Sequence, residues 1–387
     1  MADYWEVVVV EDTEAMRAQL KDFLERQTYA GRRLHVEEFA DFASAQSRIR
    51  TRKIDILVLD IIEGAPKGDR AAATPGLEIL EEIQRTVFVP VIIYTAAPER
   101  VRAAASAFVT VIGKDDKGFP SISARLKELF DLRVPQVARA VSTHLDRATC
   151  SYMWGFVGKH WDKFKELVDK PEFIRILLLR LAQAVSRDQV AAVEAEVLGE
   201  KAKGAGAAAS DETVHPVEMY IMPPLGEELV LGDIRAKGNG ATIEYWIILW
   251  PSCDLVSRGG RTPKTESVLC AKGSLLTACQ EYTSWTQNKS ETTTKKLKRL
   301  LKNTRDSGEG ITKERFHYLP AVVDLPDLVI DFQALHHFSI AELRGMKRLA
   351  TLGSPFAESL AARFSNYILR LGTPDLDLKQ VLERLGT

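Results

Sequence analysis

The stretch "KIDILVLDIIEGAPKG", residues 53–68, joins a short apolar run to an abrupt polar end. The run at 54–59 has the length and composition of a buried strand, and such strands are typical of parallel sheets. It stops at the carboxylate of Asp60, and a segment with Gly and Pro follows. Ligands of parallel sheets bind beyond the carboxyl ends of the strands. We therefore expect Asp60 to lie in a functional site.

Residues 1–132 alternate strand-like and helix-like segments. Short apolar runs predict strands at 5–10, 34–39, 54–59, 89–94 and 108–113. Amphipathic patterns predict helices at 14–27, 41–52, 75–86, 98–107 and 121–130. Strands that alternate with helices form parallel sheets through right-handed crossovers. The sequence therefore predicts an α/β domain that is doubly wound around a five-stranded parallel sheet.

Polar side chains follow four of these strands. Glu11 and Asp12 follow the first, Asp60 the third, Thr95 the fourth and Lys114 the fifth. In a parallel sheet these ends share one edge, so the side chains should converge. Carboxylates bind hard cations such as Mg²⁺, which offsets the charge of a phosphoryl group transferred to Asp60. Lys114 would add positive charge, and Thr95 would hydrogen-bond a phosphoryl oxygen.

The order Glu-Asp, Asp, Thr, Lys on successive strands resembles the receiver domain of two-component response regulators, over about the first third of the chain. The resemblance implies phosphorylation of Asp60 by a phosphohistidine on a histidine kinase or phosphotransfer protein, with Mg²⁺ as cofactor. It implies catalytic roles for Asp60, Thr95 and Lys114, and metal-ligand roles for Glu11, Asp12, Asp60 and Ile62. The alternative is a receiver fold that is not phosphorylated.

Three features differ from that family's usual pattern. The loop after Asp60, "IIEGAPKGDRAAATPG", is longer and would lie beside the site. Lys114 precedes Asp115 and Asp116, where the family commonly has Pro. Val111 stands where the family often has an aromatic residue, so Thr95 would move without the usual aromatic side-chain coupling.

Residues 133–198 are predicted to form a helical connector. The stretch at 172–198 is apolar on more than one face, which indicates either a helix packed between other elements or a homodimer seam. Residues 199–214 are rich in Gly and Ala and have no apolar period, as expected of a flexible linker.

Residues 215–387 are predicted to form an α+β output domain with a small antiparallel sheet or barrel. Short apolar runs with Gly turns lie between 228 and 276, further strands are expected around 320–332, and a helix is expected at about 355–371. The "LGDI" segment at 231–234 loosely resembles the barrel of MazF/PemK-type endoribonuclease toxins. That family's Arg-Pro is not evident, so no catalytic residue is transferred.

Two short motifs in this region permit more than one interpretation. In "WPSCDL", Cys253 and Asp254 suit either a nucleophile with an orienting acid or a buried thiol beside a turn-capping carboxylate. Residues 289–305 hold seven basic residues and one acidic residue on a predicted helix. This helix would bind nucleic-acid phosphates, dock on an acidic partner, or simply face solvent.

The composition of the 387-residue chain limits the function classes. The 52 basic and 53 acidic residues give a net charge of −1, so any attraction to nucleic acid would be local. The start has no basic segment followed by a long apolar core, so we expect a cytoplasmic protein without a membrane anchor. The four cysteines form no CxxC pair, which argues against a zinc ribbon or a disulfide scaffold.

The sequence thus predicts a cytoplasmic response regulator, phosphorylated on Asp60, whose output domain acts on a protein target. The receiver would catalyse its own phosphoryl transfer and would not be a conventional metabolic enzyme. The alternative is a nucleic-acid-directed effector under receiver control, such as a small-barrel ribonuclease.

Overall fold

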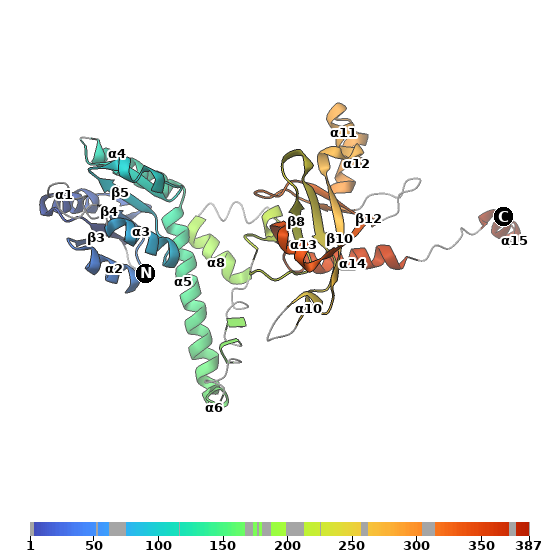
Figure 1. Ribbon diagram of the computed structural model, residues 1–387, viewed down its shortest axis with the longest axis horizontal. Coiled ribbons are helices and arrows are strands. Elements are labelled where there is room, and N and C mark those ends of the chain that lie inside the picture. Colours follow the sequence, from blue (N-terminus) through green and yellow to red (C-terminus); the bar gives the residue numbers. More distant parts are fainter. Residues whose placement is uncertain are drawn as a thin grey trace. The chain divides into compact units, whose positions relative to one another are not determined.

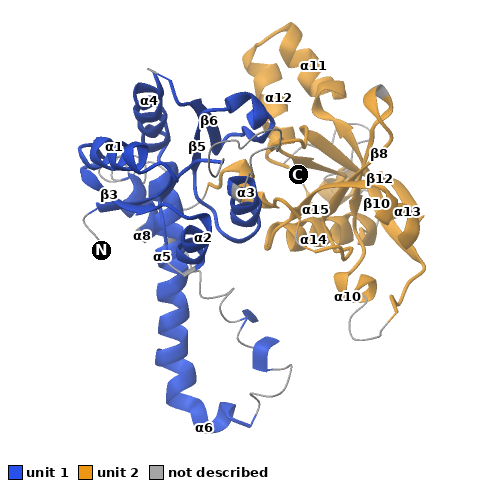
Figure 2. Cartoon of the chain, turned by 60° about the vertical axis from the view of Figure 1, so that its left-hand side comes forward, with its two compact units in different colours: residues 1–208 blue, residues 209–387 orange. Residues whose placement is uncertain are grey.

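The protein is described by a computed structural model that divides into two compact units, residues Met1–Ala208 and Ala209–Thr387 (Figure 2). The described residues are 4–51, 53–61, 75–115, 117–166, 173–175, 178–179, 187–198, 213–224, 226–256, 262–303, 314–370 and 377–386. No helix among them is long and apolar enough to cross a membrane.

The first unit contains a mixed sheet of six strands in the order β2-β3-β1-β4-β5-β6. The strands are β1 (Tyr4–Val10), β2 (Thr28–Tyr29), β3 (Arg32–Phe39), β4 (Ile56–Leu59), β5 (Val91–Thr95) and β6 (Val109–Gly113). The five longer strands are parallel, and the order β3-β1-β4-β5-β6 is that of the doubly wound flavodoxin-like fold, to which CheY belongs. The doubly wound α/β prediction for this region is confirmed.

The expectation of only five strands was wrong, because β2 folds back antiparallel on β3. Ala30 and Gly31 connect the two strands, and both have positive φ angles, 49° and 77°. Two consecutive residues of this kind form the tight hairpin turn that suits the twist of antiparallel strands.

Helices cover both faces of the sheet. They are α1 (Glu14–Glu25), α2 (Phe42–Thr51), α3 (Pro75–Thr86) and α4 (Gly118–Asp131). Alternate residues of β1 point to opposite faces, so Val8 joins the core under α2 and α3 while Val9 joins the core under α1 and α4. The helix predicted at 98–107 was wrong: η1 (Pro98–Arg100) and η2 (Arg102–Ala104) are short 3₁₀ turns. Val101 is the only large apolar side chain of this segment in the core, and helices are stabilised mainly by a buried apolar face.

A helical region follows the sheet within the first unit. Its described elements include α5 (Val134–Tyr152), a π-helical turn at Met153–Val157, a 3₁₀ turn at Gly158–His160, α6 (Trp161–Phe164) and α8 (Arg187–Leu198). Arg139 of α5 donates from Nε to Asp55 Oδ1 at 2.8 Å and from Nη1 to the Tyr4 carbonyl at 2.9 Å. These bonds hold α5 against the ends of β4 and β1 that lie opposite Asp60. Most of the apolar stretch at 172–186 and of the predicted linker at 199–214 lies outside the described residues.

The second unit contains a seven-stranded antiparallel sheet in the order β11-β12-β10-β9-β8-β13-β7. The strands are β7 (Tyr220–Ile221), β8 (Asp233–Lys237), β9 (Glu244–Ile248), β10 (Ser267–Leu275), β11 (Phe316–Leu319), β12 (Leu328–Ser339) and β13 (Lys347–Leu352). The hydroxyl of Tyr220, in edge strand β7, donates to the carbonyl of Pro320, just after the other edge strand, at 2.8 Å. The sheet is therefore strongly curled.

Helices pack on three parts of this sheet. Leu360 of α14 (Phe356–Leu369) enters the core on the inner side, and α10 (Ser252–Leu255) and α13 (Ile340–Gly345) cover the other side. At one end, α11 (Gln280–Gln287) and α12 (Glu291–Leu301) lie together (Figure 1). The last described helix, α15 (Leu378–Leu385), has no buried residue.

Candidate phosphoacceptor site

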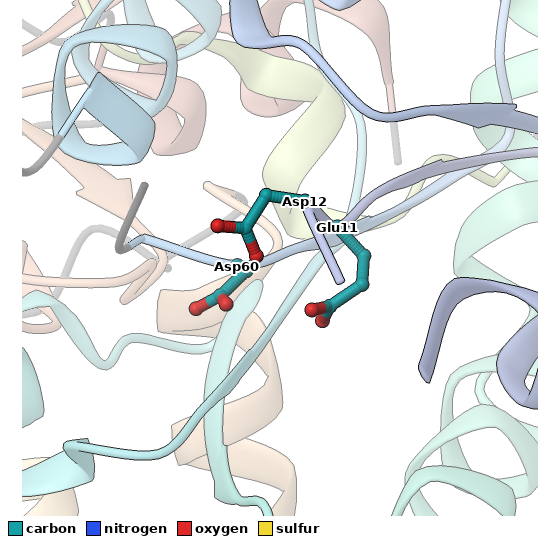
Figure 3. Close-up of side chains that lie close together, drawn as sticks. All are labelled: Glu11, Asp12 and Asp60. Atoms are coloured by element: carbon teal, nitrogen blue, oxygen red, sulfur yellow. The ribbon is translucent and has the colours of Figure 1, made fainter. Parts of the chain in front are cut away.

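The ends of β1 and β4 bring three carboxylates together. Val10 and Leu59 are partners in the parallel ladder, so the residues that follow them leave the sheet side by side. The amide of Asp60 donates to the Val10 carbonyl at 2.8 Å and continues the ladder by one residue. Glu11, Asp12 and Asp60 each offer an oxygen atom, and these three atoms lie within 4.8 Å of one another (Figure 3).

Lys114 joins two of these carboxylates. It follows β6, and its amide donates to the Thr95 carbonyl at 2.9 Å. Its ammonium nitrogen lies 2.6 Å from Asp60 Oδ2 and 2.6 Å from Glu11 Oε2. Glu11 and Asp60 are buried, and Lys114 is nearly so. Water screens the charges of this group only weakly.

Burial and pairing act in opposite directions on the pKa values of this site. Burial raises the pKa of Glu11 above its ordinary value, and the hydrogen bond and charge of Lys114 only partly offset that rise. Burial alone would lower the pKa of Lys114, but its hydrogen bonds to Asp60 and Glu11 raise it overall. The ammonium group is therefore held in its charged form.

Thr95 is the last residue of β5 and is fully buried. Its Oγ1 accepts a hydrogen bond from the Ala97 amide at 3.3 Å. Because β5 lies beside β4 in the sheet, Thr95 and Asp60 share the same carboxyl edge. The hydroxyl thus occupies the edge at which the carboxylates meet.

The donor set suits Mg²⁺. The group of Glu11, Asp12, Asp60 and Lys114 has three carboxylates and one ammonium group, so its own formal charge is negative. Carboxylate oxygens are the ligands that Mg²⁺ prefers, and the partly exposed Asp12 leaves a side where water can complete the coordination. The predicted ligand Ile62 lies outside the described residues.

Two contacts of this site were not anticipated from the sequence. Gly76, in the first turn of α3, lies so close to the phosphoacceptor strand that an added Cβ would be 2.4 Å from the Asp60 carbonyl oxygen. The Pro-Gly pair at the start of a predicted helix was the available signal. Tyr94 of β5 is buried, and its ring centroid lies 5.9 Å from Lys114 Nζ, with the ring packed against Gly118 of α4. An aromatic side chain therefore adjoins the site although position 111 holds Val.

The "WPSCDL" motif forms α10 in the second unit. Cys253 is exposed, which contradicts the interpretation of a buried thiol, because it faces outward on a single helical turn. Its Sγ lies 3.6 Å from Asp254 Oδ1, and Asp254 pairs with Lys264 at 3.5 Å. In the described part of the chain, no histidine contacts this thiol. A general base for a cysteine nucleophile is thus missing from these contacts.

No protein-family model and no curated protein matches the chain. Among solved structures, the first unit is similar to the receiver domain of the PhyR response regulator from Erythrobacter litoralis. The two are 24% identical over 32% of this chain and 90% of that one, with a TM-score of 0.25. The response regulator TrrA from Thermotoga maritima, determined with Mg²⁺ and BeF, is 20% identical over 32% and 98%, also with a TM-score of 0.25.

A third match is the complex between the phosphorylated P1 domain of CheA3 and CheY6 from R. sphaeroides. It is 15% identical over 32% of this chain and 94% of that one, with a TM-score of 0.22. These similarities concern the fold of one domain. Each of these matches covers about a third of this chain.

Proposed function

We propose that the first unit is a receiver domain that accepts a phosphoryl group on Asp60. The supporting observation is the position of Lys114, whose ammonium nitrogen lies 2.6 Å from oxygens of both Asp60 and Glu11. An Asp60 oxygen would form a bond to phosphorus while the bond between phosphorus and the donor's histidine nitrogen breaks. Lys114 would then pair with a phosphoryl oxygen, and the Thr95 hydroxyl would donate to another.

Glu11, Asp12, Asp60 and Ile62 are the residues proposed to hold Mg²⁺. When bound, Mg²⁺ would offset the negative charge of the phosphoryl group and of the carboxylates around it. The three carboxylate oxygens within 4.8 Å of one another support this assignment.

We infer that the phosphodonor is a histidine kinase or a phosphotransfer protein. Among the matched structures, CheY6 forms a complex with a phosphorylated P1 domain of CheA3. A donor of this class would meet the receiver in the cytoplasm, where the sequence predicts this protein.

We propose that phosphorylation alters how the second unit binds a protein target. Leu378, Leu382 and Leu385 of α15 are all at least half exposed and lie on one side of the helix, as in helices that bind an apolar groove. Val137 and Leu145 of α5 are exposed at similar fractions. They support a homodimer contact through α5, which is a different part of the connector from the stretch at 172–198 for which a seam was predicted.

A second candidate for the output is binding to nucleic acid. It is favoured by the basic side chains that line α12.

Intact-mass measurement tests the phosphorylation proposal. The protein is incubated with acetyl phosphate, with Mg²⁺ or with a chelator, and the Asp60→Asn variant serves as the control. We expect one phosphate-sized gain that requires Mg²⁺ and is absent from the variant. If neither acetyl phosphate nor a panel of phosphorylated kinase and phosphotransfer domains gives this gain, the proposal is wrong.

A further inference from the structure

Helix α12 has one apolar side and one strongly basic side. Leu297 and Leu300 are buried against Leu276 and Val329, and they anchor the helix on the sheet. The opposite side borders an open groove of about 510 Å³. Its charged lining consists of Lys289, Lys295, Lys298, Arg299, Lys302 and Glu291. The groove is thus lined by five cations and one carboxylate. Because the whole chain has a net charge of −1, this positive field is local to the groove.

The cations of α12 are regularly spaced. Lys295, Lys298 and Lys302 follow one another at intervals of three and four residues, so they lie along the same side of the helix. With a rise of 1.5 Å per residue, Lys295 and Lys302 are about 10 Å apart along the axis. A ligand that contacts them all must carry several negative charges in a row. A nucleic-acid strand meets this requirement, because its phosphates repeat every few ångströms.

The lining is a poor match to a protein interface. Buried interface centres are rich in aromatic and apolar side chains and depleted in lysine, whereas four of the five cations in this groove are lysines. The lysine ammonium is a compact charge that suits phosphate oxygens. Near the groove, Lys289 Nζ lies 4.9 Å from the centre of the Trp285 ring, and Trp285 packs beside Tyr282. Basic grooves beside aromatic side chains are the usual means of binding single strands.

We propose that the groove along α12 binds the phosphate backbone of single-stranded nucleic acid. This inference rests on the second candidate output proposed above, and it does not require Asp60 to be phosphorylated. Beyond that candidate output, it specifies which residues contact the phosphates, and it specifies that the ligand is single-stranded.

Fluorescence anisotropy with the full chain and a labelled oligothymidylate of about 16 nucleotides tests this proposal, since single-strand sites span several nucleotides. If all five cations contact phosphates, the logarithm of affinity should fall against the logarithm of salt concentration with a slope of about −3.5. Replacing two contacts in the double variant Lys295→Glu/Lys298→Glu should reduce the slope to about −2 and weaken binding at least about tenfold at low salt.

A matched variant controls for loss of charge alone. Lys159→Glu/Lys163→Glu replaces two exposed lysines of the connector and changes the net charge by the same amount as the α12 double variant. It should leave oligonucleotide affinity within about twofold of the original value. Circular dichroism on both variants establishes that each is folded. Lys295→Gln/Lys298→Gln offers a milder change in case the Glu pair unfolds α12.

Several results would overturn the proposal. These are no binding at micromolar protein in low salt, equal weakening by the connector variant, tighter binding of a duplex of the same sequence, or equal affinity for polyglutamate. The intact mass after acetyl phosphate treatment is measured on the same variants. Failure of that reaction with retained oligonucleotide binding would reject only the phosphorylation proposal, and the reverse result would reject only this one.

Discussion

Each unit of the chain buries carboxylate and basic groups together, but the two groups differ in position and in balance. In the first unit the group lies just beyond the strand ends, where Lys114 is shared between Asp60 and Glu11. In the second unit, Asp233 is fully buried within β8, and the guanidinium groups of Arg235 and Arg348 surround it.

In the cluster of the second unit, both oxygens of the Asp233 carboxylate accept hydrogen bonds from neighbouring side chains, whereas the buried Arg235 Nε has no partner among the described residues. Asp233 Oδ1 accepts from Arg348 Nε at 2.9 Å and from the Thr351 hydroxyl at 2.6 Å, while Arg235 Nη2 donates to Oδ2 at 3.3 Å. Arg235 Nη1 also donates to the Leu343 carbonyl at 2.7 Å, which ties β8 to α13. Burial lowers the pKa of Arg235, although Asp233 opposes this shift.

The comparison separates two uses of buried charge. Around Asp233 the donors outnumber the carboxylate oxygens and bond to backbone carbonyls, so the cluster holds strands and a helix together. The cluster around Asp60 has three carboxylates and only one ammonium group. One of the carboxylates, Asp12, is partly exposed at the edge of the sheet. The first arrangement stabilises the fold, and the second suits a divalent cation and a phosphoryl group.

Asp233→Asn should have the largest effect on stability. It leaves the buried guanidinium of Arg235 and the partly buried guanidinium of Arg348 without their carboxylate, and breaking a buried ion pair in this way costs about 3–5 kcal/mol. Urea unfolding monitored in the second unit measures the loss, and phosphorylation of the first unit should not change. Asp324→Asn is the control, because its pair with Lys347 is exposed and contributes about 1 kcal/mol or less. A loss of less than about 1 kcal/mol for Asp233→Asn would remove the distinction between the clusters.

Lys114→Met should slow phosphorylation about 100-fold, because a charge that stabilises the transferring group is lost. It also leaves Glu11 and Asp60 without their shared cation, so Mg²⁺ should raise the unfolding temperature more in this variant than in the original protein. The rate of mass gain and thermal unfolding with and without Mg²⁺ give the two readouts. An unchanged rate, or no stabilisation by Mg²⁺, would contradict the role given to Lys114.

Gly76→Ala should destabilise the first unit by about 1–3 kcal/mol, since the new methyl group would press on the Asp60 carbonyl. Phosphorylation should slow as well, because α3 or the end of β4 must shift. Gly155→Ala is the control: nothing lies within 4 Å of its added Cβ, so no clash is expected. Equal effects of the two substitutions on denaturant midpoints would show that close packing at Gly76 is unimportant.

The smallest expected effect is a pH dependence of Mg²⁺ affinity. Burial raises the pKa of Glu11, so this group takes up its proton at a higher pH than an ordinary Glu, and protons compete with a metal for a carboxylate. Affinity should therefore fall on acidification, beginning above the ordinary Glu pKa of about 4.3. Calorimetric titrations from pH 7 downward measure the fall. Glu11→Gln should bind Mg²⁺ more weakly and lose this part of the pH dependence, and a flat profile for the original protein would exclude the mechanism.

Much of the fold of the first unit was predictable because the patterns that determine it lie in short, continuous segments of the sequence. Apolar runs such as 54–59 identify buried strands, and the alternation with helices fixes parallel pairing, so the meeting of Glu11, Asp12, Asp60 and Lys114 follows from the strand ends. The short strand β2 was not predicted from the sequence, because its formation depends on the two-residue turn that joins it to β3. The contact of Gly76 with Asp60 depends on tertiary packing, which periodicity does not report.

The second unit was less predictable because its pairings are distant in sequence. Strand β13, which was not anticipated, pairs with β8 more than a hundred residues earlier. Hydrophobic alternation indicates which face of a strand is buried, but it does not identify the neighbouring strand. For the same reason the cluster of Asp233, Arg348 and Thr351 could not be foreseen from the "LGDI" segment.

Chemical trapping of the phosphorylated residue tests the central claim most directly. After treatment with acetyl phosphate and Mg²⁺, borohydride reduces an aspartyl phosphate to homoserine, and peptide mass spectrometry locates the change. We predict homoserine at position 60, dependent on Mg²⁺, with Asp12 and Asp233 unchanged. Conversion of another carboxylate, or no conversion after treatment with both acetyl phosphate and phosphorylated kinase domains, would contradict the assignment of Asp60 as the phosphoacceptor.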